Sequence, residues 1–250
     1  MGKAFDESDP FRFEFKYQLD RSDALAVEHD LKRLGMILDP NARSAPTGDY
    51  PVTSLYFDSP ILSDFYDKLG GFLDRKKIRA RIYSDYLDDR TDNVWLEIKK
   101  KHNACILKHR VKLSKGQWQK FLNRGGMNLP EGQFSEAETG TLKEIVWHVQ
   151  RDLARPLVFV RYRRRPYILR NHTMRVTFDS FLETCPSGDL SRPASPVPVE
   201  KGAVIMELKF DSTLPSWFNF LVRKYGLVRD EFSKYARSAQ VVNRYDPLPR

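Results

Sequence analysis

The sequence predicts an α+β fold in which an antiparallel β-barrel encloses a tunnel and carries helices on its outside. Seven segments alternate polar and apolar residues with a period of two, the pattern of strands whose two faces meet different surroundings. Shorter segments with helical periodicity and recognisable ends lie between them. Three of the predicted strands also repeat one charged pattern, which indicates that their polar faces serve a common purpose.

Taken in order, the predicted strands cover residues 11–19, 76–87, 94–101, 106–113, 157–164, 174–182 and 203–211. The predicted helices cover 20–35, 59–71, 114–125, 136–153, 215–225 and 233–243. Asp20 or Ser22, Ser59 before Pro60, and Ser114 are the expected N-caps of the first three helices. The proline-rich stretch 186–202 reads as a loop, so we expect a tail at 1–10 followed by one domain over 11–245.

The composition favours a protein that binds polyanions. Its net charge is +9 and its sequence pI is about 9.5, which suits nucleic acid, an anionic membrane or phosphorylated small molecules. No apolar run is long enough to span a bilayer, and the N-terminus lacks the pattern of a signal peptide. We therefore expect a cytoplasmic location.

The repeated charged pattern is Glu-apolar-Lys. It occurs as Glu14-Phe15-Lys16, Glu97-Ile98-Lys99 and Glu207-Leu208-Lys209. A spacing of two places each Glu and Lys on one face of its strand and the apolar residue on the other. The same faces are expected to carry Arg79, Arg81, Lys101, Lys108, Arg110 and Lys112, and the opposite faces Phe13, Phe15, Ile98, Leu107 and Val111.

Two interpretations fit these charged faces. An open sheet with one wet face is the simpler, but like charges opposite each other on neighbouring strands destabilise a sheet. A closed sheet would direct the cations into one lumen, where a polyphosphate could neutralise them and arginine could hold phosphate oxygens bidentately.

The glutamates on these faces need their own explanation, because carboxylates repel a polyanion. A divalent cation, Mg²⁺ or Mn²⁺, would accept one or two carboxylates and complete its shell with phosphate oxygens. Glu207 is the first candidate ligand, with Glu97 and Glu14 as helpers. In the alternative, each glutamate forms an ion pair with a neighbouring lysine.

Other phosphate and metal sites are disfavoured. The sequence contains no GxxxxGK[ST] and no GxGxxG after a strand, which argues against a P-loop and a Rossmann site. Its five histidines never take HxxxH spacing, so a zinc site is not expected. The run 161–165 alternates between two faces of a predicted strand and lacks an accompanying RNA-binding aromatic motif, so we expect no specific nucleic-acid partner.

A set of ordered motifs resembles the vacuolar transporter chaperone (VTC) domain, a polyphosphate polymerase of the CYTH-like triphosphate tunnel metalloenzymes. The motifs are RFEFKY (12–17), TSLYFDS (53–59), KIRARIY (77–83), WLEIKKK (95–101), KHRVKL (108–113), VRYRRRPY (160–167), RVTFD (175–179), VIMELKF (204–210) and EFSKY (231–235). The resemblance runs from about residue 10 to 243. It implies an antiparallel β-barrel tunnel that binds ATP or polyphosphate with a divalent metal.

Carried over residue by residue, the resemblance implies phosphate ligands at Lys16, Arg79, Arg81, Lys99, Lys112 and Arg164. It implies a tunnel-mouth lysine at Lys234, a metal ligand at Glu207 and a tunnel-lining position at Tyr56. Lys101 and Arg110 join the substrate-binding set because they share strand faces with these cations.

One departure bears on the reaction. Hydrolytic members of the wider superfamily open with ExExK, whereas this chain has Arg12 in the first position, giving RFEFK. Replacing a carboxylate by a cation should weaken metal binding and favour longer polyanions. The sequence therefore favours an enzyme that transfers the ATP γ-phosphoryl group to polyphosphate. A metal-dependent triphosphatase and a non-catalytic polyphosphate-binding module are the alternatives, and the oligomeric state stays open.

Overall fold

The computed structural model describes residues 13–102, 105–124, 133–169, 174–193, 195–210 and 213–245. Arg12 and the predicted tail at 1–10 lie outside these residues, as does Gly125, where a helix was predicted to end. All structural statements below concern the described residues.

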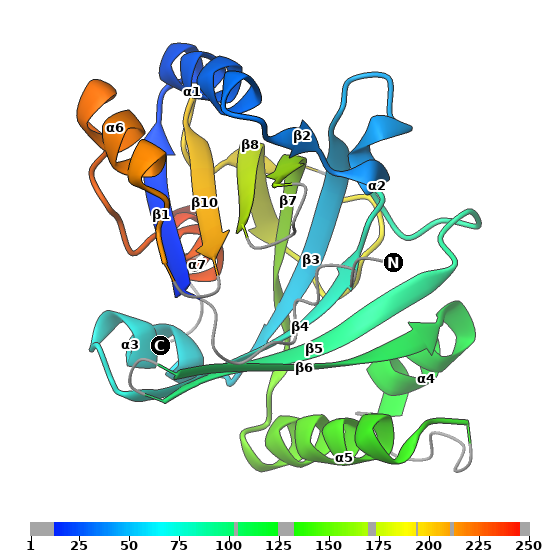
Figure 1. Cartoon of the computed structure of the whole chain (residues 1–250). Coiled ribbons are helices and arrows are strands. Elements are labelled where there is room, and N and C mark those ends of the chain that lie inside the picture. The colour runs from blue at the N-terminus through cyan, green and yellow to red at the C-terminus, as the bar shows by residue number, and fades with distance from the viewer. Residues whose placement is uncertain are drawn as a thin grey trace. The chain divides into compact units, whose positions relative to one another are not determined.

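The chain forms an α+β fold, as predicted (Figure 1). Its strands are β1 (Phe13–Leu19), β2 (Ile37–Leu38), β3 (Tyr50–Asp58), β4 (Asp74–Ile82), β5 (Asn93–His102), β6 (Cys105–Ser114), β7 (Arg155–Ile168), β8 (Met174–Pro186), β9 (Val197–Pro198) and β10 (Val204–Phe210). Its helices are α1 (Arg21–Arg33), α2 (Pro40–Arg43), α3 (Ser63–Leu69), α4 (Lys115–Arg124), α5 (Glu136–Arg151), α6 (Ser216–Lys224) and α7 (Lys234–Tyr245).

The strands form one ten-stranded sheet in the order β1-β10-β8-β7-β3-β4-β5-β6, with β2 added to β7 and β9 to β8. The pairs β1–β10, β10–β8, β2–β7, β3–β4, β4–β5 and β5–β6 are antiparallel, as predicted. Within the described residues β1 and β6 stand at the two ends of this order and do not pair with each other. The hydrogen-bonded order therefore runs from one edge to another rather than around a closed barrel.

The structure divides into two compact units. Unit 1 comprises the described parts of Met1–Pro51, Tyr162–Leu182 and Pro198–Ser233, and unit 2 those of Val52–Arg161, Glu183–Val197 and Lys234–Arg250. The boundary runs within β3, β7, β8 and β9. The single domain predicted over 11–245 stays a prediction.

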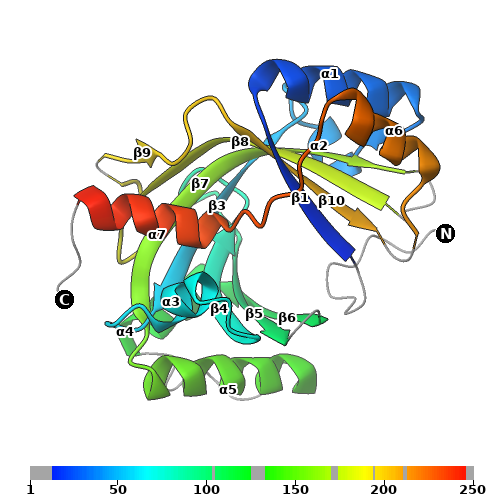
Figure 2. The same ribbon diagram turned by 90° about the vertical axis from the view of Figure 1, so that its left-hand side faces the viewer.

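In unit 1, α1 and α6 cover one face of β1 and β10 (Figure 2). Val27 and Leu31 of α1 and Phe218 of α6 pack with Tyr17 and Leu208 in its core. Asp20 caps α1 as predicted, because its carboxylate accepts a hydrogen bond from the Asp23 N–H at 2.8 Å.

In unit 2, α4 and α5 cover the apolar face of β4, β5 and β6, while Figure 2 shows α7 on the other side of these strands. Ile98 and Val111 are fully buried in this core, as the alternation predicts. Leu107 is an exception, since it is 42% exposed although it lies on an apolar strand face, and Phe13 of unit 1 is another at 52%. Ser135 and Glu138 form a capping box at the start of α5.

Two local predictions were wrong. β3 was not among the predicted strands, because seven successive residues of this strand are buried and the segment shows no polar–apolar alternation. The second predicted helix, expected to begin at Ser59 and Pro60, is α3, which begins at Ser63 instead. Asp58 supplies the missing cap, accepting hydrogen bonds from the N–H groups of Asp64 and Phe65 at 3.0 Å each.

Candidate phosphate-binding site

Unit 2 carries a continuous basic face on β4, β5 and β6. Cross-strand registers place its residues in rows, and residues directly opposite each other share a face. The rows are Arg75–Lys101, Lys77–Lys99–Lys108, Arg79–Glu97–Arg110 and Arg81–Trp95–Lys112. We call this set the basic face. It brings together Arg79, Arg81, Glu97, Lys99, Lys101, Arg110 and Lys112 from the predicted site.

Two lysines adjacent in sequence to residues of the basic face confirm the two-residue alternation on which this face depends. Lys100 points away from it, with its Nζ 2.5 Å from Glu144 Oε1 on α5. Lys76 also lies on the α5 side, where its Nζ contacts Asp64 at 2.6 Å and Asp152 at 3.0 Å. The run of lysines at 99–101 is therefore divided between two faces by strand geometry alone.

Glu97 lies at the centre of the basic face and is only 1% exposed. Its Oε2 accepts a hydrogen bond from Arg79 Nε at 2.6 Å, and its Oε1 lies 3.0 Å from Lys108 Nζ. Burial works to raise the pKa of Glu97, but the charges of Arg79, Arg81 and Lys108 outweigh it and hold that pKa well below the usual range. These contacts favour the ion-pair alternative for Glu97 over metal ligation.

β3 adds polar side chains along the edge of this face. Arg79 donates a hydrogen bond to the Tyr56 hydroxyl at 3.0 Å, and Arg81, 4% exposed, donates to Ser54 Oγ at 3.2 Å. Burial works to raise the pKa of Tyr56, yet the charges of Arg79 and Arg81, followed by Lys234, lower it. The pKa of a buried phenol and the pKa of a buried carboxyl group are both lowered, which indicates a strongly positive local potential.

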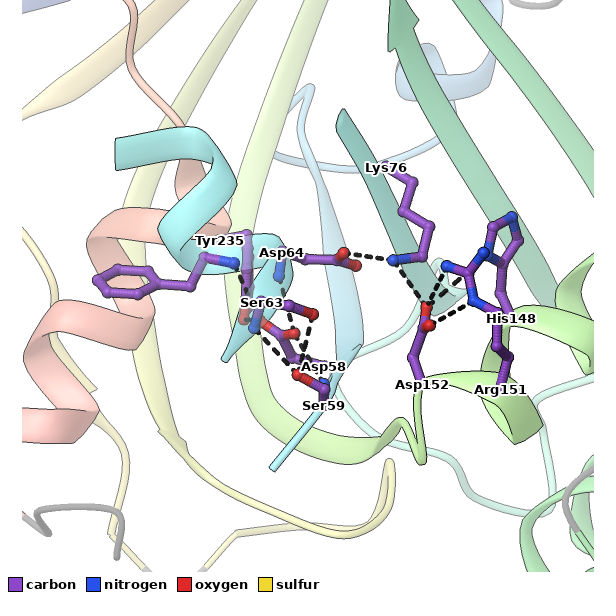
Figure 3. A network of polar contacts seen from close by, with 10 residues as sticks. Asp58, Ser59, Ser63, Asp64, Lys76, His148, Arg151, Asp152 and Tyr235 are labelled. Carbon is purple, nitrogen blue, oxygen red and sulfur yellow. Dashed lines mark hydrogen bonds and ion pairs between the residues drawn. The ribbon is translucent and has the colours of Figure 1, made fainter. Parts of the chain in front are cut away.

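The first turn of α7 lies beside Tyr56. The Tyr235 ring packs against the Tyr56 ring with centroids 5.1 Å apart, and Lys77 Nζ lies 5.8 Å from the centroid of Tyr235. Tyr235 also donates a hydrogen bond to Asp58, the residue that caps α3 (Figure 3). Tyr56 and Asp58 of the SLYFD motif therefore contact Tyr235 of the FSKY motif, far away in the sequence. Lys234 is the first residue of α7.

The Tyr235→Phe variant is expected to lose about 1.5–3 kcal/mol of stability, because it removes a hydroxyl that donates to a buried carboxylate but keeps the ring. Urea unfolding should detect the loss. Tyr66→Phe is the matched control, since Tyr66 is 55% exposed. Equal stability of Tyr235→Phe and the unmodified protein would contradict the role given to this contact.

Unit 1 carries a second charged lattice, on β1 and β10. Glu14 lies opposite Lys209 and Lys16 lies opposite Glu207, so opposite charges alternate across the two strands. Lys16 Nζ lies 2.9 Å from Glu14 Oε1 and donates to the Phe232 carbonyl at 3.0 Å. Lys209 Nζ lies 3.3 Å from Glu207 Oε1. This lattice brings together Glu14, Lys16 and Glu207 from the predicted site.

The carboxylates of this lattice are the ligand type that Mg²⁺ and Mn²⁺ prefer, and each of them also contacts a lysine. Thr177 on β8 lies opposite Glu207, and its buried hydroxyl has no hydrogen-bond partner among the described residues. Such ions accept one or two carboxylates and take further oxygens from phosphate and water. No group of three or more His, Cys, Asp or Glu side chains gathers in the described part of the chain. The fit therefore depends on Glu207 and Glu14 with added phosphate oxygens.

Arg164, also in unit 1, is engaged by a carboxylate. Its Nε and one terminal nitrogen donate to the two oxygens of Asp179 at 2.7 and 2.8 Å, and the arginine is 6% exposed. Burial works to lower the pKa of Arg164, but the Asp179 charge raises it well above the ordinary value. This bidentate contact favours a structural ion pair over the phosphate contact implied by the resemblance.

Sequence reasoning missed three residues of the unit 2 site. Lys77 could have been found, because it continues the two-residue alternation of Arg79 and Arg81. Trp95 could have been found in the same way from Glu97 and Lys99. Tyr235 gave no such signal, since its contacts with Tyr56 and Asp58 depend on tertiary structure.

The fold and the basic face define an α+β protein that is built on one antiparallel sheet. It carries a cluster of cationic side chains of the kind that bind phosphate. The chain belongs to the VTC domain family, whose sequence model matches residues 11–243. No curated protein matches the chain by sequence.

Among solved structures, one similar fold is a candidate adenylate cyclase from Bacillus halodurans. It shows a TM-score of 0.51 and 10% identity, covering 90% of this chain and 93% of that one. A candidate adenylyl cyclase from Hippeastrum, described as having a dominant triphosphatase activity, has a TM-score of 0.49 and 14% identity over 92% and 97% of the two chains. At 10% identity the first likeness concerns the fold alone.

None of the helices in the described residues combines the length and apolar character needed to cross a membrane.

Proposed function

We propose that the chain is a polyphosphate polymerase that uses ATP as phosphoryl donor together with a divalent metal ion. A terminal oxygen of the acceptor polyphosphate forms a bond to the γ-phosphorus of ATP. The bond from the γ-phosphorus to the oxygen bridging it to the β-phosphate breaks, and that oxygen leaves with ADP. The acceptor thereby grows by one phosphate.

The clustering of cations on the basic face is the observation that carries this proposal. Their charges lower the pKa of two buried acidic groups, Glu97 and Tyr56. Lys77, Lys99 and Lys108 stand abreast on three adjacent strands, an arrangement that a bound polyanion would stabilise. Lys234 adds a cation to the N-terminal end of a helix, where the helix dipole disfavours it and an anion would be favoured.

Phosphoryl transfer requires mainly positioning and charge neutralisation, so the proposal needs no covalent nucleophile. We assign phosphate binding to Arg79, Arg81, Lys99 and Lys112, and further substrate contacts to Lys101 and Arg110 on the same face. Lys234 is assigned to orient donor or acceptor, and Tyr56 to support Arg79. When bound, a divalent metal would supply charge neutralisation. In unit 1, Glu207 and Glu14 are the residues that would hold it, and the role of Lys16 stays a prediction.

One incubation tests the activity against both alternatives. The protein is mixed with ATP, Mn²⁺ and a short polyphosphate primer, and ADP, free phosphate and polyphosphate length are measured together. A polymerase gives ADP in step with chain growth. A triphosphatase gives free phosphate without growth, and a binding module gives neither ADP nor growth; either result would refute the proposal.

The Glu207→Gln variant is expected to need about tenfold more Mn²⁺ for half-maximal turnover, because it loses a ligand charge but keeps its shape. Turnover as a function of Mn²⁺ concentration measures the effect, and thermal unfolding checks the fold. Glu200→Gln serves as a control at a partly exposed loop position. An unchanged metal dependence would reassign Glu207 to its ion pair with Lys209.

A further inference from the structure

Trp95 interrupts the charged pattern of the basic face. It shares this face of β5 with Glu97, Lys99 and Lys101, and its cross-strand neighbours are Arg81 and Lys112. The apolar core lies on the opposite side of the strand, where Val94 and Leu96 are fully buried. Packing of the core therefore does not account for a large aromatic side chain at this position.

Arg110 covers the Trp95 ring. Its guanidinium carbon lies 4.5 Å from the ring centroid, and both residues are half-buried. Guanidinium planes and aromatic rings are the two surfaces on which proteins stack nucleobases, and such stacking tolerates any base. A cation over an aromatic ring also holds the guanidinium plane in a fixed orientation.

Cations surround Trp95 on this face. Arg81 and Lys112 lie directly opposite Trp95 in its own row, and the Arg79–Glu97–Arg110 row lies two residues, or about 7 Å along a strand, farther on. A base stacked on Trp95 would therefore have phosphate ligands within reach of its triphosphate.

We infer that Trp95 and Arg110 form a nucleoside subsite on which the base of ATP stacks, beside the cations of the basic face that take its phosphates. The inference rests on the proposed function for the identity of the triphosphate.

Binding of two ligands to the Trp95→Ala variant tests the subsite. Calorimetry compares a non-hydrolysable ATP analogue with inorganic tripolyphosphate, which carries the phosphates without a base. The variant is expected to bind the ATP analogue about tenfold more weakly, while its affinity for tripolyphosphate changes less than about twofold. Trp147→Ala is the matched control, because Trp147 lies on α5 with 53% of its surface exposed and also carries a stacked arginine, Arg151.

The two-ligand comparison separates recognition from mere support of Arg110. Equal weakening for both ligands would overturn the subsite and leave Trp95 as a residue that positions Arg110. Unchanged affinities for both would overturn it as well. Trp95→Phe, which keeps an aromatic surface, is expected to retain most of the preference for the ATP analogue and serves if the alanine variant fails to fold. Because binding is measured without turnover, an inactive protein would refute the polymerase and still decide the subsite.

Discussion

The free energy of unfolding of the Glu97→Gln variant is expected to be about 3–5 kcal/mol lower than that of the unmodified protein. Glu97 is buried, and its two carboxylate oxygens contact Arg79 and Lys108. Glutamine keeps the shape but removes the charge, so at least two largely buried cations lose their counter-charge. Urea unfolding at neutral pH measures the difference.

The control is Asp92→Asn, which removes the same charge at an exposed loop position and should change stability by less than about 0.5 kcal/mol. Polyphosphate should restore much of the loss in Glu97→Gln, because the bound anion replaces the missing charge. Equal stabilisation of both proteins by polyphosphate would contradict binding at the basic face.

The pH dependence follows from the lowered pKa of Glu97. A carboxyl group with a lowered pKa in the folded protein contributes stability above its unfolded pKa and loses it as the pH falls through the folded value. The difference in unfolding free energy between Glu97→Gln and the unmodified protein should therefore stay constant between about pH 6 and 8. It should narrow only under strongly acidic conditions.

The charged faces could be predicted from the sequence because strand geometry has a strict period of two. Glu97 and Lys99 fall on one side of β5 and Lys100 on the other, where it contacts Glu144. The composition of the segment would not separate these neighbours, but the alternation does. The α+β class followed from the same reasoning, since most strands of this fold keep one apolar face.

The partners of the charged groups could not be predicted in this way. Arg164 and Asp179 meet because β7 and β8 lie side by side, and nothing in either segment alone specifies that pairing. The capping of α3 by Asp58 is equally hidden, because the cap lies five residues before the helix begins. Sequence periodicity specifies the face of a residue, whereas its ion-pair partner depends on which strands become neighbours.

The Arg81→Lys variant is expected to lose about a hundredfold in ATP turnover, or about 2.7 kcal/mol of transition-state stabilisation. Arg81 is 4% exposed and donates to Ser54 through Nε, which holds the plane of its guanidinium group. Lysine keeps the charge but not the planar fork that orients a phosphate for in-line transfer. A surface that merely attracts polyanions would tolerate the change, because that attraction depends on charge far more than on geometry.

Turnover and polyphosphate affinity are therefore measured together, with Arg90→Lys at a highly exposed loop position as the control. Lost turnover with affinity kept within about threefold supports catalysis at the basic face, whereas normal turnover in a folded Arg81→Lys protein would remove Arg81 from the reaction.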